Sequence, residues 1–343
     1  MSIVFLIVAV VLAGTARADF VLTGTEHLNV NTNHATGVLW DSSTADVLAG
    51  GRVDWLWAYG TSSVNVSGGN VSGLDAYDTS SVNVSGGSVS YGLKTRGTSS
   101  VNVSGGSVSG YLYAYDTSSV NVSGGSASML RAYDTSSVNV SSGNVDYLYA
   151  ENDSSVNVPG GSVSYGLYAY DTSSVNVSGG SISGYLQARG TNSVNVSGGS
   201  VRYLSAENDS SVNVSGGTIS GYLRALHASS VNVSGGTISG YLSAYNTSTV
   251  TLHGYDFRGM GGLTLDGDRV LGTGLLTGKW FDGTSWAIPV QEHHIGATIR
   301  VVPEPSTLAL LATGAVGLVT YAWRRRRRVA VPLGVNLFIV PPG

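Results

Sequence analysis

Apolar and polar residues alternate along the chain in a pattern that recurs over most of its length. The segment Ser81–Ser90 reads Ser-Val-Asn-Val-Ser-Gly-Gly-Ser-Val-Ser, and near copies of it follow one another every 18 or 19 residues. The first Val of each copy is Val64, Val82, Val101, Val120, Val138, Val156, Val175, Val194, Val212, Val231 or Val250. This period is short for helical repeats and typical of one coil of a β-solenoid. The pattern therefore predicts an all-β, parallel β-solenoid (β-helix) of about 11 coils.

The apolar positions within each copy indicate which residues face the core. Val82 and Val84 flank Asn83, which is the period-two alternation of a strand with one buried face. Seven residues after the first Val comes Val, Ile or Ala, and each copy then has a Leu followed two residues later by Ala, or once by Thr95. These positions are predicted to stack in columns inside the solenoid.

Two corners of the coil can be located from the residue types found there. The second Gly of the Ser-Gly-Gly turn occurs in all ten full copies, which predicts a positive φ. Four residues before the first Val, the chain has Asp, Asn, Gly or once His, the types that tolerate the left-handed region. We interpret this Asp column as backbone geometry, with calcium ligation or acid catalysis as alternatives. Replacing Asp116 by Gly is then expected to cost little. An optional Gly before the Leu predicts a bulge there.

The first residues have the features of an export signal. An apolar run from Ile3 to Leu12 is followed by Ala16-Arg17-Ala18, a small-x-small site. We therefore predict a signal peptide at residues 1–18, with Ala16 and Ala18 as the signal-peptidase site. The boundaries predicted after it are an N-terminal cap at 19–43, β-solenoid repeats at 44–253 and a C-terminal β cap at 254–300.

Three features follow one another near the C-terminus. The triplet Pro303-Glu304-Pro305 precedes Ser306–Trp323, a stretch of 18 residues without a charge. As a helix, this stretch would be roughly 27 Å long, enough for the hydrocarbon core of a membrane. Five Arg residues follow directly, and such a cluster is expected to stay on the cytoplasmic side. The order of features predicts a transmembrane helix.

This arrangement resembles the PEP-CTERM sorting signals of Gram-negative bacteria, and the resemblance covers residues 303–328. In that family the signal holds the exported protein in the inner membrane until an exosortase removes it, and many members are linked to exopolysaccharide or biofilm matrix. The resemblance implies a sorting signal with a transmembrane helix at 301–328. Its sorting motif would be Pro303, Glu304 and Pro305, and its cytoplasmic retention cluster Arg324, Arg325, Arg326, Arg327 and Arg328. The tail at 329–343 departs from the family pattern, because such signals usually end near the basic cluster.

Charge narrows the functional classes. Between residues 19 and 300 the chain has 11 basic and 20 acidic residues, a net charge of −9. Nucleic-acid binding needs a basic footprint, so an acidic ectodomain argues against it. We predict no cofactor, no metal ion and no nucleic-acid partner. The expected partners are the exosortase, the export machinery and exopolysaccharide.

A catalytic site on a solenoid would interrupt the repeat locally. The departures from the repeat lie in outward columns on different coils; they are Lys94, Arg96, Arg131, Glu151, Arg189, Glu207, Arg224 and His227. Asp75 with Lys94, and Arg189 with Glu207, occupy the same column of adjacent coils and are predicted to form cross-strand ion pairs. No two carboxylates converge as in a glycosidase. We therefore predict no catalytic residues and no enzymatic activity.

Outward aromatic residues make binding the stronger alternative. They are Tyr77, Tyr115, Tyr133, Tyr170 and Tyr245, and they lie beside Asn and Ser ladders that suit a sugar, an ice surface or only solvent. We expect an exported structural or adhesive protein that lies at the cell surface or in the extracellular matrix after processing. The alternative is a β-solenoid that binds polysaccharide or, as a weaker option, degrades it.

Overall fold

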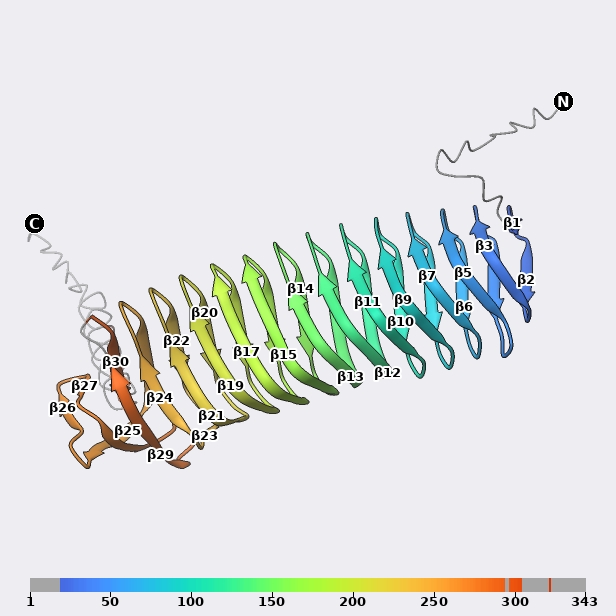
Figure 1. Ribbon diagram of the computed structural model, residues 1–343. Helices are drawn as coiled ribbons and strands as arrows, with labels where there is room; N and C mark the ends of the chain where they lie inside the picture. Colours follow the sequence, from blue (N-terminus) through green and yellow to red (C-terminus); the bar gives the residue numbers. More distant parts are fainter. Residues whose placement is uncertain (1–18, 294–295, 304–320, 322–343) are drawn as a thin grey trace, which may run out of the picture.

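Each coil of the chain consists of a short strand, a glycine corner, a long strand and an Asp or Gly corner. The computed structural model describes residues 19–293, 296–303 and 321, and its parallel strands form a rod of about 12 turns (Figure 1). Equivalent residues of successive coils pair directly, as Val82 does with Val101. The predicted parallel β-solenoid is confirmed, with no helix among the elements that the structure describes.

Two stacks of strands run along the rod. The stack of short strands contains β2 (His27–Val30), β4 (Thr44–Val47), β6 (Ser63–Val66), β8 (Ser81–Val84), β10 (Ser100–Val103), β14 (Ser155–Val158), β16 (Ser174–Val177), β18 (Ser193–Val196), β20 (Ser211–Val214) and β22 (Ser230–Val233). The stack of long strands contains β1 (Phe20–Leu22), β3 (Asn33–Leu39), β5 (Arg52–Ala58), β7 (Asn70–Ala76), β9 (Ser88–Thr95), β11 (Ser107–Ala114), β15 (Ser162–Asp171), β17 (Ser181–Gly190), β19 (Ser200–Glu207), β21 (Thr218–Ala225), β23 (Thr237–Ile238) and β24 (Tyr241–Ala244). Two strands, β12 (Ser119–Ala132) and β13 (Ser137–Ala150), continue through the glycine corner and belong to both stacks.

The core is a set of apolar columns that run the length of the rod. From β4 onward, the two Val positions of the short strand and the Val, Leu and Ala positions of the long strand are almost completely buried in every coil. From β4 onward a buried Ser, such as Ser80 or Ser118, precedes each short strand, and Asn192 replaces it once. A single coil could not bury these residues, so each depends on its neighbours for a core.

The ends of the rod continue the same stacking. Residues 19–43, the segment expected to cap the N-terminal end, contain β1, β2 and β3, and both stacks begin there with parallel pairs. This pairing brings the rod to about 12 turns. The C-terminal strands are β25 (Thr249–Met260), β26 (Thr264–Asp266), β27 (Arg269–Leu271), β28 (Gly274–Lys279), β29 (Ser285–His293) and β30 (Thr298–Pro303). Antiparallel pairs join β25 to β28 and β26 to β27, while β29 and β30 pair in parallel with β24 and β25. Buried Trp280 anchors this end, since its Nε1 donates to the carbonyl oxygen of Gly236 at 2.8 Å.

The Asp corner adopts the left-handed backbone that the sequence predicts. Its φ is 58° at Asp78, 57° at Asp116 and 67° at Gly97. The side chains add a contact that the residue types alone did not reveal, because each Asp reaches the preceding coil. The Gly97 amide donates to Asp116 Oδ2 at 2.8 Å, and the Asp116 amide donates to Asp134 Oδ2 at 3.0 Å. Asp therefore both tolerates the left-handed backbone of the corner and accepts a hydrogen bond from the preceding coil.

The glycine corner matches its prediction in only part of the rod. From Gly125 to Gly236 the second Gly has a positive φ, 62° at Gly125, but Gly69, Gly87 and Gly106 do not. For these three residues the predicted positive φ is wrong, and close packing explains the glycine instead. A Cβ on Gly87 would lie 2.4 Å from the carbonyl oxygen of Gly69. The optional Gly does mark a bulge, since the register shifts between Val108 and Tyr111.

Asparagine side chains link the short strands on their outer face. Asn83 Nδ2 donates to Asn65 Oδ1 at 2.8 Å, and Asn65 Nδ2 donates to Asp46 Oδ1 at 2.7 Å. Asp46 also contacts His27 Nε2 at 2.8 Å and so ends this ladder. Partial burial alone would raise the pKa of Asp46, but hydrogen bonds from Asn65 and His27 and the proximity of the His27 ring together lower it. A second run of the same bonds connects Asn157 to Asn232.

The Asp corner can be tested with a series at Asp116. Asp116→Asn keeps both an acceptor and a side chain that tolerates the left-handed region, so the free energy of unfolding should stay within about 0.5 kcal/mol of wild type. Asp116→Ala should lower it by about 1 to 2 kcal/mol through backbone strain, and Asp116→Gly by less because only the bond to the Gly97 amide is lost. Urea denaturation measures all three. Equal stability of the Ala and Asn variants would contradict the corner assignment.

The charged end of the asparagine ladder predicts a pH dependence. Because the folded-state pKa of Asp46 is depressed, its stabilising effect is present above the ordinary carboxyl value and lost as the pH falls through the folded pKa. Asp46→Asn should therefore lower the free energy of unfolding by about 1 kcal/mol at pH 7, and the difference should shrink below about pH 3.9. Urea titrations at several pH values measure it, with exposed Asp266→Asn as control. A difference that does not change with pH would reject the charge effect.

Candidate functional site

The outer surface of the long strands carries three parallel columns of side chains. Around Leu112 and Ala114, which point inward, Tyr111, Tyr113 and Tyr115 point outward because side chains alternate along a strand. We call the position before the Leu the first column, the position after it the second, and the position after the Ala the third. The aromatic face comprises the aromatic residues of these columns and of the bulge: Trp40, Trp55, Trp57, Tyr59, Tyr77, Tyr91, Tyr111, Tyr113, Tyr115, Tyr133, Tyr147, Tyr149, Tyr165, Tyr168, Tyr170, Tyr185, Tyr203, Tyr222, Tyr241 and Tyr245.

In the third column the rings stack from coil to coil. The Trp40 and Tyr59 rings are 4.3 Å apart and nearly parallel, and Tyr59 and Tyr77 follow at 4.8 Å. Arg96 comes next in the column, and its guanidinium lies 4.8 Å from the ring centroid of Tyr115. Beyond it, Tyr115 and Tyr133 stack at 4.9 Å. The coil spacing thus holds aromatic faces at stacking distance and places a cation within the stack.

The second column combines rings with ionic groups. The Arg131 guanidinium lies 4.4 Å from the Tyr149 centroid, and its Nη1 donates to the Tyr133 hydroxyl and to Glu151 Oε1, each at 3.3 Å. Tyr149 then stacks on Tyr168 at 5.1 Å. Arg131 and Glu151 are only partly exposed, so their ion pair and the cation–π contact reinforce each other more than fully solvated groups would.

The first column is aromatic without interruption in the last coils. Tyr185, Tyr203, Tyr222 and Tyr241 follow one another with centroids 5.1, 4.8 and 5.6 Å apart. Arg224 lies 4.6 Å from the Tyr222 centroid. This part of the face therefore offers a strip of tilted rings that runs along the axis of the rod.

Burial raises the pKa of several phenols of the aromatic face. Burial first, and then the neighbouring tyrosines, raise the pKa of Tyr168, and burial with the nearby Asp75 raises that of Tyr77. Asp75 itself has a raised pKa, because burial outweighs the opposing effect of Lys94. A phenol with a raised pKa remains a hydrogen-bond donor at neutral pH. The face therefore combines apolar ring surface with hydroxyl groups that can both donate and accept.

The two predicted ion pairs lie in the predicted register but do not form close contacts. Asp75 faces Lys94 and Arg189 faces Glu207 in adjacent strands. Neither pair is among the ion pairs within 4.0 Å that occur in the described residues. Glu207 instead accepts a hydrogen bond from Gln187 Nε2 at 2.7 Å. In the described part of the chain, no group of three or more His, Cys, Asp or Glu could hold a metal ion.

The sequence pointed to only part of this face. The five tyrosines that the sequence analysis named, from Tyr77 to Tyr245, all belong to the third column. The first and second columns were missed, as were the tryptophans near the N-terminal end. The spacing of Tyr111, Tyr113 and Tyr115 was the available signal, because residues two apart on a strand point to the same side of the sheet.

The residues predicted for export and sorting lie almost entirely outside the described part. Ala16 and Ala18, Glu304 and Pro305, and the cluster Arg324–Arg328 are all outside it. Pro303 is described: it is the exposed last residue of β30 and pairs with Gly254. The predicted transmembrane helix also falls outside, and no helix of the described residues is long and apolar enough to cross a membrane.

Comparison with known proteins identifies the C-terminal segment. The family model of the PEP-CTERM protein-sorting motif matches residues 301–327, which include the Pro-Glu-Pro triplet and four of the five Arg residues. No curated protein and no solved structure matches the chain. The motif implies export and exosortase sorting to the cell envelope or surface. The chain is therefore an exported β-solenoid protein that carries a C-terminal PEP-CTERM sorting motif.

Proposed function

We propose that the protein is a structural or adhesive component of the cell surface or the extracellular biofilm matrix of a Gram-negative bacterium. The observation that carries the proposal is the direct connection between rod and motif. The last strand, β30, ends at Pro303, the first residue of the triplet. A cut within or after the triplet would release the rod as one unit, with its full outer surface available for contacts.

Polysaccharide binding is the second candidate, and the aromatic face favours it. Ring faces and neutral phenols over many coils suit an extended partner whose sugar units present apolar C–H faces and hydroxyl groups. We propose that exopolysaccharide at the cell surface is this partner. The acidic ectodomain, with a net charge of −9 between residues 19 and 300, suits a neutral chain better than an anionic one.

We propose no catalytic activity. Glycoside hydrolysis needs two carboxyl groups within about 10 Å of each other. In the second and third columns of the aromatic face the carboxyl groups are Asp75, Glu151 and Glu207, and the nearest two, Glu151 and Glu207, lie three coils apart in the ladder of paired strands. At about 4.8 Å per coil they are separated by roughly 14 Å, too far to act on one glycosidic bond.

For sorting, we propose that residues 306–323 span the inner membrane before processing, with Arg324–Arg328 on the cytoplasmic side. The Arg cluster would then hold the helix in place, because charges cross the hydrocarbon core at a high cost. The triplet would lie at the periplasmic boundary of the membrane, where an exosortase could reach it.

The location of the protein tests its proposed role. In the native host, immunogold labelling and fractionation should place the processed chain at the cell surface or in the matrix. Deleting its gene should reduce attachment of cells to a surface at least about twofold, and expression from a plasmid should restore it. Recovery of the chain only in the periplasm, or unchanged attachment, would reject the structural or adhesive role.

The sorting proposal predicts different outcomes for two variants. Changing the triplet at 303–305 to Ala-Ala-Ala should leave the chain inserted in the membrane but uncleaved. Deleting Arg324–Arg328 should let the apolar stretch slip through the bilayer and release an unprocessed chain. Fractionation and mass spectrometry in the native host measure both, with a change of exposed Gln291 on β29, Gln291→Ala, as control. Equal processing of wild type and triplet variant would reject the exosortase assignment and leave a plain membrane anchor.

A further inference from the structure

An open groove interrupts the aromatic face near its N-terminal end. It has a volume of about 590 Å³ and lies across β3, β5, β7 and β9. This volume is within the range of small-molecule binding sites in proteins. The lining residues that matter to the argument are Arg52, Asp54, Trp55, Ser72, Ser90 and Tyr91.

Two aromatic rings form the walls of the groove. Trp55 lies flat against the backbone of Gly73, where a Cβ would come within 2.4 Å of the ring. The Tyr91 ring stands 5.9 Å from the Trp55 ring at an interplanar angle of 66°. Tyr91 sits in the bulge and is 59% exposed. The two rings therefore enclose a corner that is apolar on two sides and open to solvent on the third.

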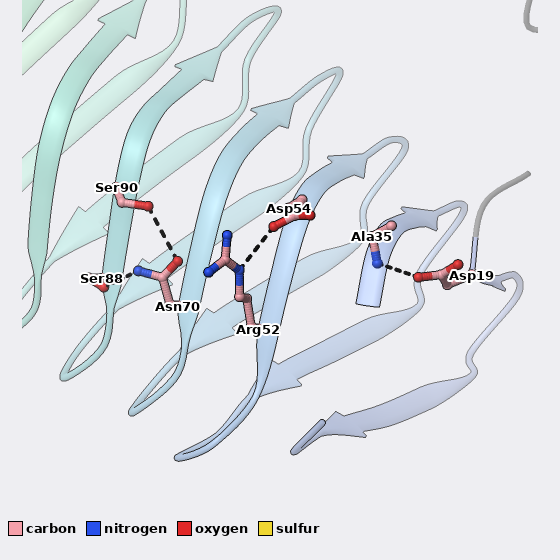
Figure 2. A network of polar contacts seen from close by, with 7 residues as sticks. All are labelled: Asp19, Ala35, Arg52, Asp54, Asn70, Ser88 and Ser90. Atoms are coloured by element: carbon pink, nitrogen blue, oxygen red, sulfur yellow. Dashed lines mark hydrogen bonds and ion pairs between the residues drawn. The ribbon is translucent and has the colours of Figure 1, made fainter. Parts of the chain in front are cut away.

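Polar groups border the same corner. Arg52 Nε donates to Asp54 Oδ1 at 3.0 Å, and both side chains are about half exposed, 58% and 48%. On the neighbouring strands Ser90 donates to Asn70 Oδ1 at 3.3 Å, and Asn70 Nδ2 donates to Ser88. Figure 2 shows these contacts side by side on successive strands of the face. Carboxylate, guanidinium and hydroxyl groups thus surround the aromatic corner.

The repeat is broken at this groove. Arg52 stands where the following coils have only Asn, Ser or Thr, and Trp55 stands where they have Gly, Tyr or Met. The core columns on either side, Val53 and Leu56, are unchanged and fully buried. The departures therefore change the outer surface while the core columns continue without interruption.

We propose that this groove is a subsite for one pyranose unit of a neutral polysaccharide. The C–H face of the sugar packs on Trp55, Tyr91 closes one side, and ring hydroxyls bond to Asp54, Arg52 and Ser90. The charges of Arg52 and Asp54 compensate each other, and the surrounding ectodomain is acidic, so a uronic-acid polymer would be repelled. The inference rests on polysaccharide binding, the second candidate function above, and not on the adhesive role.

Matched tyrosines make the subsite testable. The processed chain, recovered from the native host, is run in native gels that contain dextran, galactomannan or xyloglucan as neutral probes, or alginate as an anionic probe. At least one neutral polymer should retard it. Tyr91→Ala should weaken that retardation at least about fivefold, as should Trp55→Ala. Tyr165→Ala is the matched comparison and should weaken the retardation clearly less than Tyr91→Ala, because Tyr165 occupies the same bulge position four coils away, outside the groove, and is 57% exposed. Asp54→Asn tests the polar side without removing a ring.

The outcomes separate the proposals from one another. Equal weakening by Tyr91→Ala and Tyr165→Ala would overturn the subsite and leave binding spread over the whole aromatic face. Retardation by alginate alone would overturn the choice of a neutral ligand and with it the proposal. No retardation by any polymer would overturn both the subsite and polysaccharide binding, while the adhesive role would still depend on the location experiment. Circular dichroism of each variant shows that a loss of retardation is not a loss of fold.

Discussion

The structure depends on the in-register stacking of identical positions, because each side chain meets its own counterpart about 4.8 Å away in the next coil. A residue type stabilises such a column only if its side chain interacts favourably with the same side chain in the next coil. Val and Leu pack, Asn bonds amide to amide, and Tyr stacks ring on ring. Charged residues fail this requirement, since like charges directly opposite one another destabilise a sheet. This accounts for a chain with only 11% charged residues whose outer columns are mainly Asn, Ser and Tyr.

The charged residues that remain follow the same constraint. In the left-handed corner, Gly60, Gly97 and Asn152 separate most of the aspartates, and only Asp116 and Asp134 are adjacent. Each Asp of this corner also accepts a hydrogen bond from the corner amide of the coil before it, as Asp116 does from Gly97. On the aromatic face Arg96 and Arg131 lie between rings, where the π-face offers a partner that another Arg would not. Like charges of the Asp corner are thus kept apart, with Asp116 and Asp134 as the exception.

The periodicity was sufficient to predict the fold because the constraint acts identically in every coil. The buried Val, Leu and Ala columns and the Asp corner followed from residue types alone. The glycine corner was predicted only in part: a required Gly can reflect either a positive φ, as at Gly125, or a backbone approach, as at Gly87, and sequence does not separate the two. The groove could not be predicted, since Trp55 and Tyr91 lie two coils apart in sequence, and their contact depends on Gly73 in the coil between them, which leaves room for the Trp55 ring.

Stacking also determines what kind of binding site such a chain can offer. Functional groups repeat along the axis at a fixed spacing, so a binding surface lengthens with the number of coils without any change in the core. A partner that is itself a repeating polymer can engage several weak subsites at once, and the effective concentration of each further contact is high after the first. In the proposed subsite, a single departure from the repeat, such as Arg52 with Trp55, would have a distinct role: it would fix where the polymer is held, while the regular aromatic columns would extend the contact along the rod.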